Sequence, residues 1–122
     1  MGNDSQVTRN REVGVSRYLT QGRYTDTGLE GPLAVGGTSR RMHFEQNVSS
    51  LDGSVEAFYY AFGGEDIYAI VELPEGIAAA ALTMAIGSGG GFRANTTVLL
   101  TPEEVDMAAE KALTVGYRPP GG

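Results

Sequence analysis

Residues 54–100 read SVEAFYYAFGGEDIYAIVELPEGIAAAALTMAIGSGGGFRANTTVLL, and this stretch decides the fold. Its first part contains two runs, 54–62 and 67–73, that are rich in aromatic and β-branched side chains, as strands are. Gly63-Gly64 joins the two runs and supplies the tight turn that a hairpin needs. The stretch therefore begins with two antiparallel strands.

The second part of the stretch adds a helix and a further strand. Pro74 and Glu75 suit the start of a helix, and residues 77–86 are apolar on every side. A helix that is apolar all round is normally buried, so we expect this one to be covered on more than one flank. The glycine-rich residues 87–91 end the helix, and residues 92–100 form a strand rich in Thr, Val and Leu.

Upstream of residue 54, the pattern predicts a strand followed by a helix in two pieces. Residues 16–24 have the composition of a strand, and residues 25–27 offer helix-capping side chains. Gly36-Gly37 interrupts the helical region that follows. The second piece carries an apolar stripe at positions i, i+4 and i+7: Phe44, Val48 and Leu51.

Downstream of the last strand, a capping box marks another helix. Thr101 is the predicted N-cap, Pro102 occupies the first helical position and Glu104 the third. The helix has one apolar face: Val105, Ala108, Ala109, Ala112 and Leu113.

The order β-α-β-β-α-β with an added C-terminal helix is the split βαβ pattern of ferredoxin-like α+β folds. It predicts a four-stranded antiparallel sheet with two helices on one face. We expect a polar N-terminal arm over residues 1–14, one domain over 15–115 and a Pro/Gly-rich tail over 116–122.

Strand alternation describes the face of the sheet that the helices leave uncovered. In the strand over 67–73, one face is apolar and is expected to pack against the helices. It carries Ile67, Ala69, Val71 and Leu73, and we call it the dry face. The other face is mixed in character and is formed by Tyr68, Ile70, Glu72, Arg93, Asn95, Thr97, Leu99, Leu19, Gln21 and Arg23. Residues 54–62 are bulky on both sides, so alternation does not assign their faces. A mixed face of this kind predicts pairing with the sheet of another copy.

Composition narrows the classes of function. The chain has 122 residues, a formal net charge of −6 and no cysteine. An acidic chain disfavours nucleic acid and anionic membranes as partners, and without cysteine there is no disulfide and no thiolate metal site. Because no apolar run is long enough to span a membrane and no leader pattern opens the chain, we expect a cytoplasmic protein.

Several segments resemble the GYD-domain family, small bacterial proteins of the dimeric α+β-barrel type. The matching segments include residues 18–24 (YLTQGRY), 36–41 (GGTSRR), 55–63 (VEAFYYAFG) and 96–104 (TTVLLTPEE). The namesake Gly-Tyr-Asp triplet stands here as Gly64-Glu65-Asp66, with glutamate in place of tyrosine. The resemblance implies a fold and self-association, and it assigns no reaction, ligand or catalytic residue.

Six polar and aromatic side chains are candidates for binding a small ligand between subunits: Tyr24, Arg41, His43, Tyr68, Arg93 and Asn95. Tyrosine and arginine in such a cavity suit a small polar or aromatic compound. The competing interpretation is that Arg and Glu pair across strands and that Tyr packs the interface.

Three further clusters have a chemical and a structural interpretation. Arg40, Arg41 and His43 form either an anion-binding cluster or a solvated helix face. Residues 87–91 lack the strand-to-helix order of a phosphate loop and are interpreted as a turn. Glu65 and Asp66 are interpreted as turn residues rather than as a general acid and base.

The sequence therefore favours a homo-oligomeric, non-catalytic module that holds a small ligand between its sheets. The alternatives are a cofactor-free enzyme of the isomerase or monooxygenase type, by analogy of fold, and an accessory subunit of a larger complex. Neither a cofactor nor a metal ion is predicted.

Overall fold

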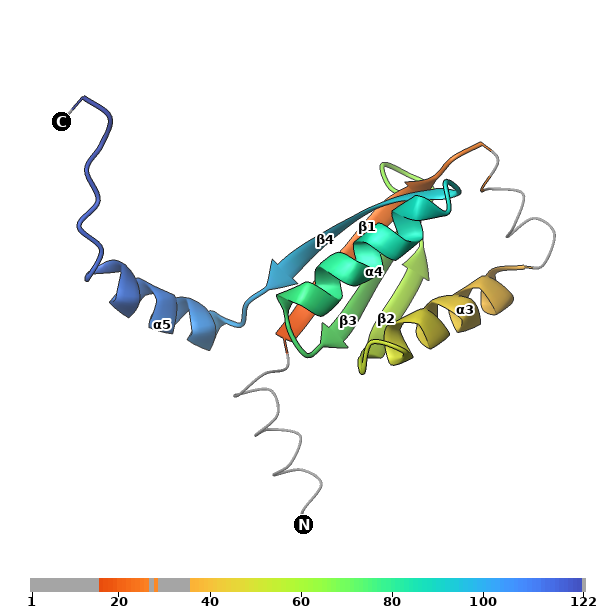
Figure 1. Cartoon of the computed structure of the whole chain (residues 1–122), viewed down its shortest axis with the longest axis horizontal. Coiled ribbons are helices and arrows are strands. Elements are labelled where there is room, and N and C mark those ends of the chain that lie inside the picture. The colour runs from red at the N-terminus through yellow and green to blue at the C-terminus, as the bar shows by residue number, and fades with distance from the viewer. Residues whose placement is uncertain (1–15, 27, 29–35, 122) are drawn as a thin grey trace, which may run out of the picture.

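The computed structural model of the chain describes residues 16–26, 28 and 36–121 (Figure 1). The elements follow the predicted order: β1 (Ser16–Tyr24), α3 (Gly37–Ser49), β2 (Ser54–Tyr60), β3 (Ile67–Leu73), α4 (Gly76–Ser88), β4 (Phe92–Leu99) and α5 (Pro102–Ala112). The predicted N-terminal arm, and the first piece of the helix before Gly36, lie outside the described residues.

The four strands form one antiparallel sheet in the order β2-β3-β1-β4, with β1 and β3 at its centre. This order is that of a ferredoxin-like fold, and α3 and α4 lie together on one face of the sheet (Figure 1). The predicted fold class, with its additional C-terminal helix, is confirmed.

The core lies between this sheet face and the two helices. The dry face of β3 is buried as alternation predicts, with Val71 and Leu73 at 0% exposure. From the helices, Val48 of α3 and Leu82 of α4 fill the layer against Tyr18 of β1. Burying an aliphatic side chain of this size stabilises the fold by about 1.5–3 kcal/mol. The predicted stripe on α3 is confirmed, since Phe44 and Leu51 pack partly buried beside Val48.

A β-bulge explains why alternation fails in β2. Val55 opposes Val71, but Ala57 opposes Ile70, so the register shifts between Val55 and Ala57 and leaves Glu56 as the extra residue. After the bulge, the odd and even positions exchange faces. Phe58 and Tyr60 therefore face the helices, while Tyr59 lies opposite Tyr68 on the open face.

Asp66 ties the β2–β3 hairpin to the end of β1. Its backbone N–H donates to the carbonyl oxygen of Gly22 at 2.8 Å. Its carboxylate Oδ2 accepts from the backbone N–H of Tyr24 at 2.9 Å. The last residue of the Gly64-Glu65-Asp66 triplet is thus a structural residue of the turn, and it fixes the position of Tyr24.

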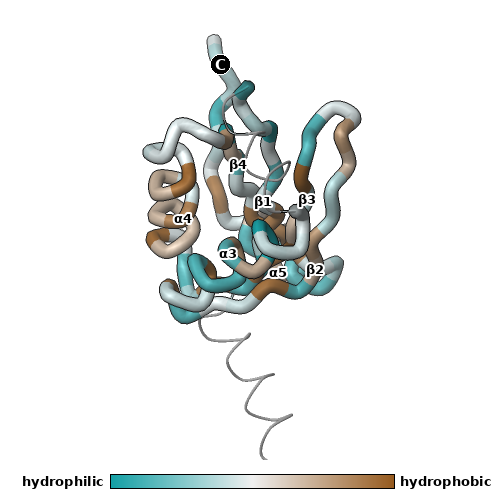
Figure 2. The backbone as a smooth tube through the Cα atoms, turned by 90° about the vertical axis from the view of Figure 1, so that its right-hand side faces the viewer, coloured by the Kyte–Doolittle hydropathy of each residue, from teal (hydrophilic) through white to brown (hydrophobic). Residues whose placement is uncertain are grey.

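Helix α4 is covered on one side only. Ala78, Ala79 and Leu82 are buried against the sheet, and the Thr83 and Thr96 hydroxyls hydrogen-bond at 2.6 Å to fasten α4 to β4. In Figure 2 the tube of α4 shows brown, tan and white but no hydrophilic teal. The expected cover on a second flank is not provided by the part of the chain that the structure describes.

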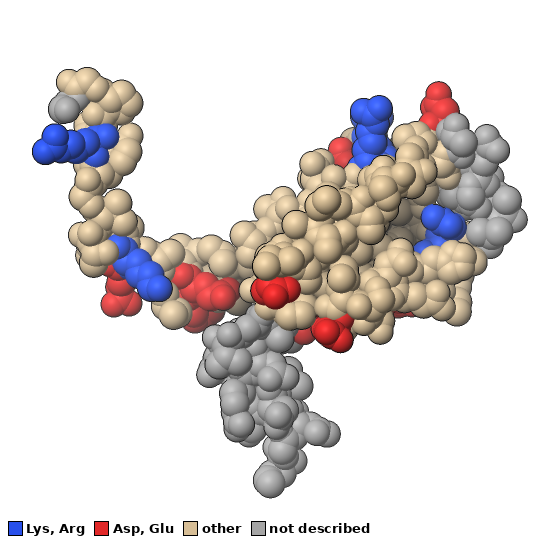
Figure 3. Space-filling view, in the orientation of Figure 1, with Lys and Arg blue, Asp and Glu red and all other residues tan. Residues whose placement is uncertain are grey.

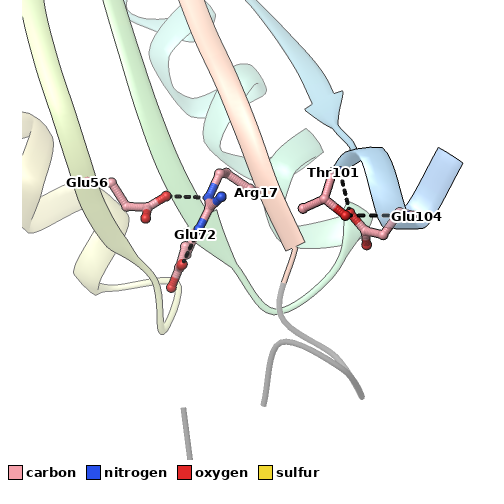
Figure 4. Close-up of polar contacts among 5 residues, drawn as sticks. All are labelled: Arg17, Glu56, Glu72, Thr101 and Glu104. Atoms are coloured by element: carbon pink, nitrogen blue, oxygen red, sulfur yellow. Dashed lines mark hydrogen bonds and ion pairs between the residues drawn. The ribbon is translucent and has the colours of Figure 1, made fainter. Parts of the chain in front are cut away.

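Helix α5 extends away from the domain (Figure 1). The predicted capping box is present, because Thr101 Oγ1 accepts from the Glu104 backbone N–H at 3.1 Å and Glu104 Oε1 accepts from the Thr101 N–H at 2.8 Å (Figure 4). None of its residues is buried. The helix therefore forms on local signals, without packing on its own domain.

Candidate functional site

A cavity of about 90 Å³ lies between α3, α4 and the sheet. Its apolar wall consists of Phe44, Phe58, Ile67, Ile86 and Phe92. Its polar side chains are Thr20, Tyr24, Arg40, His43 and Asn47. An apolar pocket with a few converging polar groups is the usual form of a small-molecule site.

Small residues on β1 and aromatic rings around them create this space. Thr20 is short, and at Gly22 a Cβ atom would lie 2.6 Å from the ring of Phe92, so only glycine lets that ring approach β1. The rings of Tyr24 and Phe92 then pack edge to face at 5.0 Å, and those of Phe44 and Phe58 lie 5.5 Å apart. The aromatic rings form the walls of the cavity, and the small residues Thr20 and Gly22 leave space beside β1.

Two polar atoms at the cavity are buried and have no hydrogen-bond partner among the described residues: Thr20 Oγ1 and Arg40 Nε. The Thr20 residue is only 1% exposed. A buried polar group without a partner costs about 1–3 kcal/mol, so native proteins rarely retain one without a reason. A bound molecule with hydrogen-bonding groups would satisfy both atoms.

The Tyr24 hydroxyl stays protonated across the physiological range. Burial raises the pKa of Tyr24 to about 12, and the neighbouring Tyr60 hydroxyl adds to this, while the Arg40 guanidinium nearby acts to lower it. Tyr60 in turn donates its hydroxyl hydrogen to the carbonyl oxygen of Gly37 at 3.0 Å. Tyr24 therefore serves the cavity as a neutral hydrogen-bonding group and not as a phenolate base.

We expect Tyr24 to make stability depend on pH in the alkaline range. Because its pKa is raised from 10.0 to about 12, its stabilising contribution is complete below pH 10 and is lost as pH rises toward 12. An alkaline titration of tyrosinate absorbance, read soon after each pH jump, should show a late-ionising phenol that Tyr24→Phe lacks. A titration unchanged by Tyr24→Phe contradicts this assignment.

The structure brings together two of the six candidate ligand-binding residues. Tyr24 and His43 line the cavity. Arg41 is exposed on α3 and does not line it, whereas Arg40 does. The other three residues, Tyr68, Arg93 and Asn95, lie on the opposite, open face of the sheet.

Sequence reasoning missed Thr20, Asn47 and the aromatic wall. A signal for Asn47 existed, because Arg40, Phe44 and Asn47 continue the helical stripe of α3 at i, i+4 and i+7. Nothing in the pattern singles out Thr20, which looks like any strand threonine until its burial is known.

The open sheet face has a row of partly buried apolar side chains between polar ends. Leu19 and Ile70 lie opposite each other across β1 and β3. At one end, Arg17 pairs with two carboxylates, Glu56 Oε2 at 2.5 Å from its Nε and Glu72 Oε2 at 3.4 Å from its Nη2 (Figure 4). Arg17, which the sequence analysis did not single out, thus links β1 to carboxylates on β2 and β3.

Two classes of site find no support in residues 16–26, 28 and 36–121. No three His, Asp or Glu side chains in these ranges gather closely enough to hold a metal ion. Nor is any helix within them long and apolar enough to cross a membrane.

The sheet order and the two-helix layer define a ferredoxin-like α+β protein with a cavity on its helical side. The family model of the GYD domain matches residues 18–109, and the chain belongs to this family. The match begins within β1, contains the rest of the sheet and the residues that line the cavity, and ends within α5. No curated protein and no solved structure matches the chain.

Proposed function

We propose that this GYD-domain protein is a homo-oligomeric, non-catalytic module that binds a small molecule with an apolar ring and an acidic group. The binding place is the cavity between α3, α4 and the sheet. The observation that carries the proposal is the pair of buried polar atoms, Thr20 Oγ1 and Arg40 Nε, that lack partners in an aromatic-walled cavity.

The apolar and the polar side chains that line the cavity select the two parts of the ligand. Its walls, including the Phe58 and Phe92 rings, favour an apolar or aromatic body. Arg40 presents N–H donors to an anion, and charge-assisted hydrogen bonds are about twice as strong as neutral ones. The Tyr24 hydroxyl lies beside Arg40, and in its protonated form it places no negative charge there that would repel an anion. A volume of about 90 Å³ limits the ligand to a small one.

The same geometry favours binding over catalysis. Tyr24 is held in its neutral form, and none of the described residues that line the cavity carries a carboxylate to act as a base. A cofactor-free isomerase or monooxygenase is the alternative function, because His43 lines the same cavity and imidazole accepts and donates protons readily.

Self-association through the open sheet face is the second part of the proposal. The row that contains Leu19 and Ile70 is an apolar strip in the middle of a sheet face that α3 and α4 do not cover. The Arg17 ion pairs and the exposed Tyr59 give the strip a polar rim, which is the usual composition of a protein interface.

Binding of benzoate, compared with its uncharged counterpart benzamide, tests the cavity. We expect wild-type protein to prefer benzoate, and Arg40→Gln to weaken benzoate binding about 10-fold, because a hydrogen bond to a charged group contributes about 1.5–3 kcal/mol. Ligand-observed NMR titration measures both affinities.

The matched control is Arg41→Gln, which removes the same charge from the neighbouring, exposed residue. Its benzoate affinity should stay within about 2-fold of wild type, as expected for a screened surface charge. Equal losses in the two variants, or equal affinity for benzamide and benzoate, would show that a specific anion site at Arg40 is absent.

A further inference from the structure

The outer face of α4 is an apolar surface that residues 16–26, 28 and 36–121 leave uncovered. The helix Gly76–Ser88 contains no charged residue, and its outward stripe consists of Ile77, Ala80 and Met84. Ile77 is 78% exposed and Met84 73% exposed. In Figure 3 the surface over α4 is tan, and charged side chains lie only around it. A helix of this composition is normally buried on all sides.

Helix α5 presents a second uncovered apolar surface on the same chain. Residues 100–121 are exposed along their whole length. One apolar stripe runs along α5, and none of its residues is buried in the core. It consists of Val105, Ala108, Ala109 and Ala112. An isolated helix as short as α5 is only marginally stable in water, so its stripe requires a partner surface.

The connection to β4 directs α5 away from its own α4. Only Leu100 and Thr101 separate the two elements, and the Thr101–Glu104 capping box fixes the entry into the helix. Figure 1 shows α5 continuing outward from the end of β4, while α4 runs back over the sheet. In this arrangement the two apolar stripes of one chain do not meet.

We infer that α5 of one copy packs on the outer face of α4 of a second copy, and that the two copies exchange these helices reciprocally. Each chain offers one stripe of each kind, so a two-fold pair satisfies all four surfaces. The interface is distinct from the open sheet face, so a chain that uses both forms an assembly larger than a dimer.

Shape, charge and size favour a second copy as the occupant. The alanines of α5 leave grooves for the long side chains of Ile77 and Met84. The acidic Glu103 and Glu110 lie on the side of α5 opposite its apolar stripe, so they stay in water when it docks. The run over residues 100–121 also matches the roughly 20–30 residues that one side of a stable interface contributes.

Disulfide trapping between copies tests this contact directly, because the chain has no cysteine of its own. We expect full-length Ala80→Cys and Ala109→Cys proteins, mixed and oxidised, to form a cross-linked pair on a non-reducing gel. The control is Met107→Cys, which places the thiol on the far side of α5. Cross-linking that is equal for positions 107 and 109, or absent for both, overturns the inference.

Association in solution provides the second measurement. Ala109→Glu should weaken self-association at least 10-fold, measured by light scattering over a dilution series, because burying an unpaired charge is costly. Met107→Glu adds the same charge on the outer side of α5, where it stays exposed. Its self-association should remain within about 2-fold of wild type. Mixing Ala109→Glu with Ala80→Lys should restore association. Failure of this rescue, with both proteins folded by circular dichroism, contradicts the α5–α4 contact.

Discussion

Replacing Gly22 by alanine should lower the free energy of unfolding by about 3 kcal/mol, near the upper end of what overpacking costs. A Cβ atom at Gly22 would lie 2.0 Å from the carbonyl oxygen of Arg93 and 2.6 Å from the Phe92 ring. The first of these atoms belongs to the backbone of the paired strand, so it moves only if β1 and β4 separate. Chemical denaturation followed by circular dichroism measures the loss.

Gly76→Ala is the matched control, because it is the same change at a glycine whose Cβ would meet nothing within 4 Å. Gly76 begins α4, where alanine is the better helix former, so the variant should be neutral or more stable by less than about 1 kcal/mol. A Gly22→Ala protein within about 0.5 kcal/mol of wild type, the usual range for a surface change, would show that β1 and β4 are less closely packed than the structure indicates.

The same substitution links the fold to the cavity. The Phe92 ring that approaches Gly22 also forms part of the cavity wall and packs against Tyr24. Any Gly22→Ala protein that still folds must move this ring, and it should bind benzoate more weakly than wild type. The stability of the fold and the binding of a ligand therefore both depend on the close packing of the Phe92 ring against Gly22.

Most of the fold follows from local signals in the sequence. In β3, strict alternation and clear turn residues on both sides make the faces readable, and the Thr101–Glu104 capping box marks the start of α5 without ambiguity. In β2, the bulge at Glu56 adds one residue, and no periodic pattern can predict where alternation changes phase. Strand pairing, a tertiary property, decides the faces there.

The site is less predictable than the fold for two reasons. It depends on how α3 is rotated about its own axis when it packs on the sheet, and it depends on positions of β1 where the residues are small. Successive helical residues differ by about 100° in direction, so whether Arg40 or Arg41 enters the cavity depends on how α3 docks. The sequence also grouped Tyr24 with Tyr68 and Arg93, although the sheet separates them onto opposite faces. The space itself results from the small residues Thr20 and Gly22, and the strand pattern does not reveal that a cavity forms beside them.

Leu82→Ala should cost the folded state about 3 kcal/mol, within the range of about 2–5 kcal/mol for removing a buried leucine. Leu82 is 1% exposed and belongs to the core cluster of Tyr18, Val71 and Leu73. Because α4 is fastened to β4 through the Thr83–Thr96 hydrogen bond, it cannot move freely into the vacated space. The loss should be independent of protein concentration, and denaturation at two concentrations measures it.

Met84→Ala, two residues further along α4, separates the two faces of this helix. Met84 is 73% exposed and lies outside the core cluster, so in dilute protein the substitution should change stability by less than about 0.5 kcal/mol. At concentrations where copies associate, it should instead weaken association, because its side chain lies on the stripe to which α5 is proposed to bind. A concentration-independent loss as large as that of Leu82→Ala would place Met84 in the core of the single chain and would remove the α4 surface from the proposed contact.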